Sequence, residues 1–103
     1  MGVYIIINKT RSNDEELVIK IGCSKNIHNR FKQIKKGFIF NGIKDELEIM
    51  QIIKCSKHRL LEKHLHQIMN SKKLINKYGN EWFKTDEDFL NRALMRIDLN
   101  YYK

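Results

Sequence analysis

The amino-acid sequence predicts a compact single-domain α/β fold, and three observations support this prediction. The chain has 103 residues, and a chain of this size buries about two thirds of its unfolded surface, which is enough for one core and one site. Apolar residues recur with a period of two in some segments and of 3.6 in others, which predicts both strands and helices. The order of these segments is ββαβα, followed by a short strand and an extra C-terminal helix. We therefore expect a small, mainly antiparallel sheet that is flanked by helices.

A hairpin is expected at the start of the chain. Val3–Ile7 and Leu17–Ile21 are rich in β-branched residues, which favour strands. Residues 8–16 between them are mostly polar, which is typical of a loop. The two runs are therefore predicted to pair with each other.

The first helix is expected to follow this hairpin. Ser24 or Asn26 can cap its N-terminus, because a short polar side chain accepts a hydrogen bond from a backbone N–H there. Its apolar face consists of residues three or four positions apart: Ile27, Phe31 and Ile34. Gly37 is expected to end the helix, since glycine is common just after a helix.

A third strand and a second helix are expected in the middle of the chain. Asn41-Gly42 marks a turn. Leu47–Ile53 is mostly apolar on both faces, which is typical of a central strand. Ser56 is expected to cap a helix that ends near Met69.

The chain is expected to close with an edge strand and a helix. Glu81–Lys84 predicts the short strand, and Thr85-Asp86 opens the helix. One stripe of this helix is apolar, with Phe89, Leu90, Ala93, Leu94 and Ile97. We expect residues 1–84 to form the main domain and residues 85–103 to add a C-terminal helix packed on the same domain.

The charge of the chain favours a polyanionic partner. Lys and Arg number 20 against 12 Asp and Glu, and the net charge is +8, which attracts nucleic acid. Solubility alone is the alternative explanation. Cys23 and Cys55 are the only cysteines, which predicts a reducing intracellular compartment, cytoplasmic or nuclear, rather than secretion. No apolar run approaches the roughly 20 residues of a membrane span.

Four sequence elements occur in a distinctive order. They are Gly2-Val3-Tyr4, Lys20-Ile21-Gly22 with Arg30 after it, Leu61-Glu62-Lys63-His64-Leu65-His66, and Gly79-Asn80-Glu81-Trp82-Phe83. This combination, over about residues 2–84, resembles the GIY-YIG nuclease superfamily, and within it the small phage and viral branch with a Lys-Ile-Gly second motif. The resemblance implies an endonuclease that hydrolyses DNA phosphodiester bonds with one Mg²⁺ or Mn²⁺ per active site.

The chain also departs from the family pattern. The second motif begins with Lys20 where the family name has tyrosine, and fifteen residues separate Tyr4 from Lys20, a long connection. Cys23 stands where several members have lysine. Asn76 and Asn80 compete for the final family asparagine.

Glu62 is the expected metal ligand, as the resemblance implies. A carboxylate suits Mg²⁺, which often takes only one or two protein carboxylates and completes its shell with water and phosphate. Helical geometry places Glu62 beside Leu65 and Met69, at the margin of the apolar stripe. The alternative is a surface glutamate that pairs with a neighbouring Lys or His.

The resemblance assigns roles to three further side chains. Tyr4 would orient or deprotonate the attacking water, although a phenol needs a nearby cation to act as a base at neutral pH. Lys20 would supply that cation or contact phosphate. Arg30 would clamp the scissile phosphate, because its planar fork binds two oxygens at once. One more basic residue on a basic helix is the alternative for Arg30.

The histidines and the other lysines are assigned by their position. His66 is expected to assist as a proton carrier or as the partner of Glu62, and a solvated histidine is an equal alternative. His58, Glu62 and His66 form a row on one helix, but a zinc site would need further ligands. Solvated side chains are expected at His58, His64 and His28. Contacts to the DNA backbone, or else a solvated face, are expected for Lys25, Lys32, Lys35 and Lys36.

These observations predict a metal-dependent endonuclease, with a catalytically silent nucleic-acid-binding module of the same fold as the alternative. A protein-interaction domain is a third class. Trp82 and Phe83 are expected in the core rather than stacked on bases. DNA is the expected partner, RNA remains open, and cutting both strands would call for a homodimer or for two successive nicks.

Overall fold

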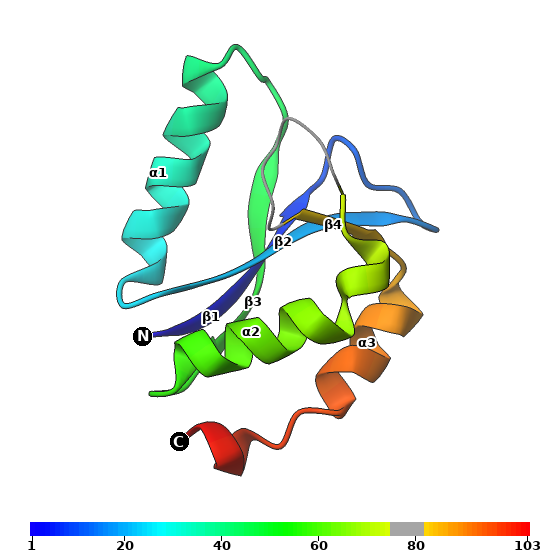
Figure 1. Ribbon diagram of the computed structural model, residues 1–103. Helices are drawn as coiled ribbons and strands as arrows, with labels where there is room; N and C mark the ends of the chain where they lie inside the picture. The colour runs from blue at the N-terminus through cyan, green and yellow to red at the C-terminus, as the bar shows by residue number, and fades with distance from the viewer. Residues whose placement is uncertain (75–81) are drawn as a thin grey trace.

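A computed structural model describes residues 1–74 and 82–103 of the chain (Figure 1). Its strands and helices, in chain order, are β1 (Gly2–Asn8), β2 (Leu17–Ser24), α1 (Ile27–Phe40), β3 (Leu47–Lys54), α2 (His58–Ile68), β4 (Trp82–Thr85) and α3 (Glu87–Met95). Short 3₁₀ turns follow α2 at Asn70–Lys72 and α3 at Leu99–Tyr102. The predicted α/β fold class and the predicted order of elements are confirmed.

Four antiparallel strands form one sheet in the order β3-β1-β2-β4. β1 and β2 form the predicted hairpin, with Ile5 opposite Ile21. β4 pairs with the first half of β2 and lies at an edge of the sheet, as predicted. Of the predicted edge strand, Glu81 lies outside the described residues, as do Asn76 and Asn80.

The sheet separates two apolar cores. Successive side chains of a strand point to opposite faces, so Val3 and Ile5 lie in one core while Tyr4 and Ile6 lie in the other. α2 and α3 cover the first face, and α1 covers the second (Figure 1). Side chains on opposite faces are therefore separated by the sheet, and a ligand can contact both sets only at an edge or an end of the sheet.

The predicted central position of β3 is wrong, because β3 is an edge strand next to β1. Most of its side chains are partly buried or exposed, and Ile53, at 9% exposed, is the one buried side chain of the strand. The pairing with β1 shifts between Ile5 and Ile6, and Met50 opposite this shift is 43% exposed. An irregularity of this kind at an edge discourages pairing with another chain. β3 has apolar residues on both faces because helices cover both faces of the sheet, even at its edge.

Helix α1 begins as predicted but ends later. Asn26 is the N-cap, and its side chain accepts a hydrogen bond of 3.1 Å from the backbone N–H of Asn29. Ser24 is instead the last residue of β2. Gly37 does not end the helix, which continues to Phe40 and is capped by Asn41. The predicted turn follows at Gly42, whose φ of 71° is the left-handed conformation that glycine adopts readily.

The caps of the other two helices differ from each other. Asp86 caps α3 as predicted, because its carboxylate accepts a 2.7 Å hydrogen bond from the Phe89 N–H. Ser56 does not cap α2. The N-cap of α2 is Lys57, which makes no side-chain capping bond. A 3.1 Å contact joins His58 Nδ1 to the Ser56 carbonyl, and because a carbonyl only accepts, the ring donates there and does not cap the helix.

The C-terminal segment packs on the same core as α2. The apolar stripe predicted for α3 lies in this core or against it, although Ile97 follows the end of the helix. Tyr102 is buried. Its hydroxyl lies 2.5 Å from His64 Nδ1, and its carbonyl accepts a 3.0 Å hydrogen bond from the Lys57 N–H. Within the described parts of the chain, every helix is too short or too polar to span a lipid bilayer.

Tyr102→Phe is expected to reduce the loss of folding stability at alkaline pH. Burial raises the pKa of the Tyr102 phenol, so the unfolded chain ionises first as the pH rises past about 10. This stabilisation is fully present below that pH and is lost as the pH rises towards the folded-state pKa. Urea-unfolding midpoints at neutral and alkaline pH measure the effect. Tyr101→Phe, at an exposed neighbour, should keep the full alkaline loss, and an equal loss in both variants would contradict the prediction.

Candidate active site

The second half of β2 extends beyond the end of β4. The described pairs between the two strands run from Leu17 to Lys20, which leaves Ile21 past this pairing. His66 of α2 reaches this part of β2, and its Nε2 lies 2.7 Å from the Ile21 carbonyl oxygen. A carbonyl only accepts hydrogen bonds, so Nε2 carries the proton and donates it. The imidazole also packs edge-on against Phe83, with ring centres 5.2 Å apart.

The phenol of Tyr4 lies over Gly22 on the opposite face of the sheet. Tyr4 and Gly22 are directly paired between β1 and β2. A Cβ atom added to Gly22 would lie 2.2 Å from the Tyr4 hydroxyl oxygen, so only glycine allows the phenol this position. Tyr4 is 2% exposed and packs with Ile27 and Trp82. The site therefore begins with a phenol that is held against the backbone of β2.

Gly22→Ala is expected to destabilise the protein by about 1 to 3 kcal/mol, because the new methyl group overlaps the Tyr4 ring. Tyr4→Leu should remove most of this penalty, so the two substitutions should be strongly non-additive. Urea unfolding of both single variants and of the double variant measures the coupling. Gly37→Ala is the matched control, since nothing lies within 4 Å of a Cβ atom there, and it should not destabilise. Additive effects at Gly22 and Tyr4 would show that the ring is not the obstacle.

Lys20 lies on the same face as Tyr4. It is paired with Ile6 on β1 and with Trp82 on β4, so it stands diagonally across from Tyr4, within reach of a long side chain. Lys20 is 8% exposed, and its Nζ lies 5.8 Å from the centre of the Trp82 ring. The burial predicted for Trp82 is confirmed.

Glu62 lies close to His66 on α2. Its carboxylate Oε1 is 3.9 Å from His66 Nε2, which is an ion pair only when the imidazole is protonated. The distance exceeds that of a hydrogen bond, because Nε2 donates to Ile21 instead. Both side chains are partly buried, at 20% and 26% exposed. They line an open hollow of about 480 Å³ with Arg59, Lys63, Gln67 and Asn70.

This hollow offers a metal ion one carboxylate. Among residues 1–74 and 82–103, no three His, Cys, Asp or Glu side chains gather as a zinc site would require. The row of His58, Glu62 and His66 therefore does not converge. The expectation of solvated histidines is also wrong for His58, which is 8% exposed, and for His64, which is partly buried against the Tyr102 hydroxyl. A single half-buried carboxylate fits Mg²⁺ or Mn²⁺, which can complete their coordination with water and phosphate oxygens.

Along the sequence, Glu62 is the only acidic residue in the segment that lines this hollow. Residues 17–44 contain seven Lys and Arg and no Asp or Glu, and residues 49–80 contain seven Lys and Arg with Glu62 as their sole acid. The other described carboxylates lie in the β1–β2 loop, around the start of β3, or at α3 and after it: Asp14, Glu15, Glu16, Asp45, Glu46, Glu48, Asp86, Glu87, Asp88 and Asp98. Glu62 is thus one negative charge among many positive ones. This pattern is readable from the sequence.

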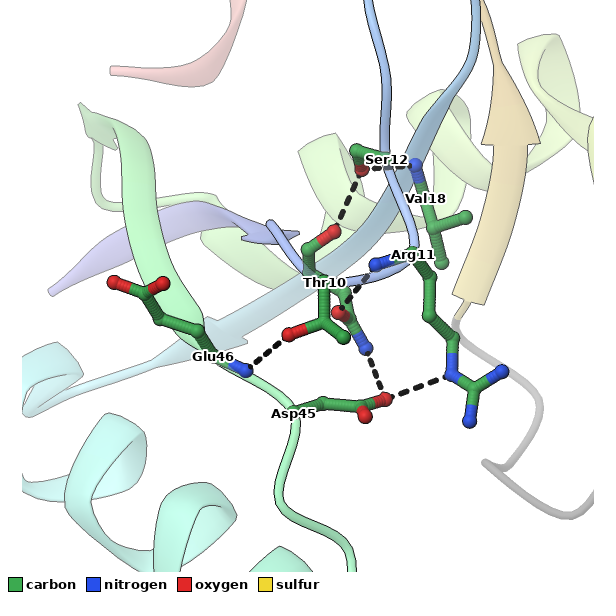
Figure 2. A network of polar contacts seen from close by, with 7 residues as sticks. Thr10, Arg11, Ser12, Val18, Asp45 and Glu46 are labelled. Carbon is green, nitrogen blue, oxygen red and sulfur yellow. Dashed lines mark hydrogen bonds and ion pairs between the residues drawn. The ribbon is translucent and has the colours of Figure 1, made fainter.

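Ion pairs neutralise cations at the hairpin end of the sheet. Arg11 Nε donates to an Asp45 oxygen at 2.7 Å (Figure 2). The same end carries a 3.2 Å pair between Lys9 and Glu48 and another between Lys84 and Glu16. Figure 2 also shows Thr10, whose hydroxyl accepts a 2.8 Å hydrogen bond from the backbone N–H of Glu46. The contacts around the β1–β2 loop therefore form a polar network that holds this loop against the start of β3.

Arg30 and the lysines around α1 are exposed. Arg30 lies in the first turn of α1, and its Nη1 is 3.4 Å from the Gln33 side-chain oxygen. Exposure is also found at Lys25, Lys32, Lys35 and Lys36.

Residues Lys20 to Gly22 of β2 connect three of the predicted site residues: Lys20 itself, His66 through Ile21, and Tyr4 through Gly22. Glu62 follows through His66, whereas the contact that the structure gives Arg30 is to its own helix.

Sequence comparison matches residues 1–98 of the chain to the family model described as the T5orf172 domain. The matched region includes both the sheet and α3. No curated protein and no solved structure matched the chain.

Proposed function

Since the chain belongs to the T5orf172 domain family, we propose that the protein is a metal-dependent endonuclease of the GIY-YIG type that hydrolyses DNA phosphodiester bonds. This family is associated with GIY-YIG-like and phage endonuclease-type modules. The observation that carries the proposal is that one stretch of β2, Lys20–Gly22, carries Lys20, lies under the Tyr4 phenol on one face and accepts a hydrogen bond from His66, beside Glu62, on the other. These are the positions that the family resemblance assigns to the chemistry.

Each side chain has a role in the proposed reaction. Tyr4 positions the attacking water or accepts its proton, and Lys20 favours the phenolate by its charge. Arg30 binds two oxygens of the scissile phosphate. A Mg²⁺ or Mn²⁺ held by Glu62 would supply positive charge against the charge that gathers on the phosphate. The Nε2–H of His66 donates to the Ile21 carbonyl, so it is not free to protonate the leaving oxygen. His66 instead forms part of the wall of the hollow beside Glu62.

A second function is favoured by one observation. Tyr4 is 2% exposed, so its hydroxyl has little contact with solvent, which fits a module that binds nucleic acid without cutting it. Nicking of supercoiled plasmid in Mg²⁺, in Mn²⁺ and in EDTA distinguishes the two functions. Metal-dependent nicking supports the endonuclease, and tight binding without nicking supports the binding module.

The partner proposed for both functions is DNA, with RNA as the alternative. Residues 17–44 contain no Asp or Glu, and the basic side chains of α1 are exposed, which favours contacts with phosphate. Cutting both strands would need a homodimer or two successive nicks, because each chain carries one such site.

Arg30→Lys is expected to lower turnover far more than DNA affinity, because it keeps the charge but removes the two-pronged binding of phosphate. The triple change of Lys32, Lys35 and Lys36 to Gln should do the reverse. It should flatten the dependence of log affinity on log salt by roughly 0.9 for each phosphate that the protein no longer neutralises. Fluorescence-anisotropy titrations at several salt concentrations, beside nicking rates, measure both effects.

The matched control for these lysines lies at the hairpin end. Lys9 and Lys84 already pair with carboxylates, so changing both to Gln should leave the salt dependence nearly unchanged. An equal flattening in the control and in the α1 variant would mean that affinity depends on net charge alone.

A further inference from the structure

The last turn of α1 exposes two large apolar side chains. Phe40, the final residue of the helix, is 91% exposed, and Ile39 is 74% exposed. Both lie outside the apolar cluster through which α1 packs on the sheet, which includes Ile34 and Phe38. Scattered apolar residues are common on protein surfaces, so exposure alone does not mark a site. How these side chains are held, and what surrounds them, decides what they can bind.

The end of α1 is held in one conformation by backbone hydrogen bonds. The Ile43 N–H donates to the Phe38 carbonyl at 2.8 Å, and the Gly42 N–H donates to the Ile39 carbonyl at 3.0 Å. With Gly42 at a φ of 71°, the two bonds form a Schellman motif, a helix end that depends on a left-handed residue. Phe40 therefore stands on a fixed helix end, and its ring can bind a partner without a further cost of ordering the backbone.

Phe40 shares the outward side of α1 with two lysines. Lys32, Lys36 and Phe40 are spaced four residues apart, so they follow one another along one side of the helix. Both lysines are exposed, and residues 17–44 contain no Asp or Glu. The aromatic ring thus continues a positively charged row. Such a row attracts a polyanion.

Ile39 has different surroundings. At roughly 100° per residue, Phe40 is turned about 80° from Arg30 around the helix axis, whereas Ile39 is turned about 180° from Arg30. Ile39 also lines a hollow of about 210 Å³ together with Asp45 and Glu46, whose carboxylates repel phosphate. A polyanion that reaches Arg30 and the lysine row therefore meets Phe40 and not Ile39.

DNA fits this row better than a lipid surface or a second copy of the chain. A helix that lies in a membrane surface inserts a broad apolar face, but the apolar face of α1 packs on the sheet, and Asn29 and Gln33 on the outward side are polar and exposed. A second copy would bring its own lysines against Lys32 and Lys36, which repel each other. DNA offers phosphates to the lysines, and its stacked base pairs accept an apolar wedge such as phenylalanine.

We infer that Phe40 inserts as a wedge between two base pairs of the bound DNA while Lys32 and Lys36 contact its phosphates. The inference rests on the proposed function, because it takes DNA as the partner, and it adds that the substrate is kinked at one step. Phe40 follows Arg30 by ten residues, which is about 15 Å along the helix axis. With base pairs about 3.4 Å apart, the kink lies about four base pairs from the phosphate at Arg30.

The bend of a short duplex with a dye at each end tests the inference. Binding in EDTA needs no cleavage, and a wedge that kinks the duplex brings the dyes closer together. We expect the native chain to raise energy transfer between the dyes. Phe40→Ala should bind roughly tenfold more weakly and should not raise energy transfer, whereas Phe40→Leu should keep the bend because leucine also serves as a wedge. The salt dependence of affinity should be the same in all three proteins, since no phosphate contact is lost.

Met95 provides the matched control. It is 84% exposed at the end of α3, which covers the opposite face of the sheet from α1 (Figure 1). Met95→Ala should therefore leave both affinity and bend unchanged. Phe40 and Met95 are both on the surface, so all of these variants should fold, and thermal unfolding verifies this.

Tryptophan at the same two positions reports on the contact itself. Trp82 is the only tryptophan of the native chain and is 2% exposed, so it gives Phe40→Trp and Met95→Trp the same background emission. Stacking on bases should quench the added emission of Phe40→Trp when DNA binds, and Met95→Trp should not respond. Emission of Phe40→Trp that responds to anionic lipid vesicles or to protein concentration, but not to DNA, would overturn the inference.

The outcomes also separate this inference from the proposed function. A bend that depends on Phe40 without metal-dependent nicking would retain the wedge and remove the endonuclease. Metal-dependent nicking with equal affinity and bend for the native chain and Phe40→Ala would retain the endonuclease and remove the wedge. Absence of DNA binding by the native chain would contradict both.

Discussion

Glu62→Gln is expected to abolish nicking of supercoiled DNA and to leave DNA affinity unchanged or slightly higher. The substitution keeps the size of the side chain and removes the only acidic charge of residues 49–80. A metal ligand contributes several kcal/mol to transition-state stabilisation, so the rate should fall by at least about a hundredfold. Affinity should not fall, because a negative charge near phosphate has been removed.

Glu46→Gln provides the control for this experiment. Glu46 is an exposed carboxylate at the start of β3, and its substitution changes the net charge by the same amount. It should leave nicking intact. The dependence of the nicking rate on Mg²⁺ concentration adds a second measurement. A weakened metal ligand should raise the Mg²⁺ concentration that is needed for half of the maximal rate. If Glu62→Gln nicks DNA at the native rate in limiting Mg²⁺, Glu62 is not the metal ligand.

Local signals in the sequence predict most of the elements of this fold. The β-branched runs of β1 and β2 and the caps at Asn26 and Asp86 act through neighbours in the chain. The position of β3 depends instead on which strands pair with β1. Local composition does not carry that information, so an apolar run at the edge of a sheet covered by helices has the pattern of a central strand. The cap expected at Ser56 is absent because α2 begins one residue later than the cap requires, with Lys57 at the N-cap position.

The candidate site is predictable only in part. The order of the motifs predicts which side chains belong together. In the structure Tyr4 and Lys20 lie on one face of β2, and His66, with Glu62 beside it, contacts the backbone of β2 from the other face. The partner of His66 is a backbone carbonyl, which leaves no mark in the sequence. The close contact of Tyr4 with Gly22 needs the register of the hairpin. The segregation of acids away from Glu62 is readable without a structure, because it needs only the positions of charged residues along the chain.

Tyr4→Phe is expected to lower the nicking rate by about a hundredfold or more while preserving the fold. The ring packs with Ile27 and Trp82 and lies over Gly22, so phenylalanine fills the same space and removes one oxygen atom. General-base catalysis contributes about 10² to 10⁴ to a rate. Thermal unfolding should therefore change little, whereas turnover should collapse. Tyr102→Phe removes a hydroxyl from another buried tyrosine, and it should leave nicking unchanged.

The pH profile decides which role the Tyr4 hydroxyl has. A phenol that acts as a base must ionise, so the native rate should rise with pH, and Tyr4→Phe should lose this rise along with most of the activity. Lys20→Met should move the rising limb to higher pH, because a neighbouring cation favours the phenolate. Lys20→Tyr, which restores the more common second motif, should retain more activity than Lys20→Met if the position needs only a hydrogen-bonding group. If Tyr4→Phe keeps the native rate and pH profile in a metal-dependent reaction, the water is activated without the phenol. A hydroxide on the metal at Glu62 would then be the better candidate, since the Nε2 proton of His66 is engaged by Ile21.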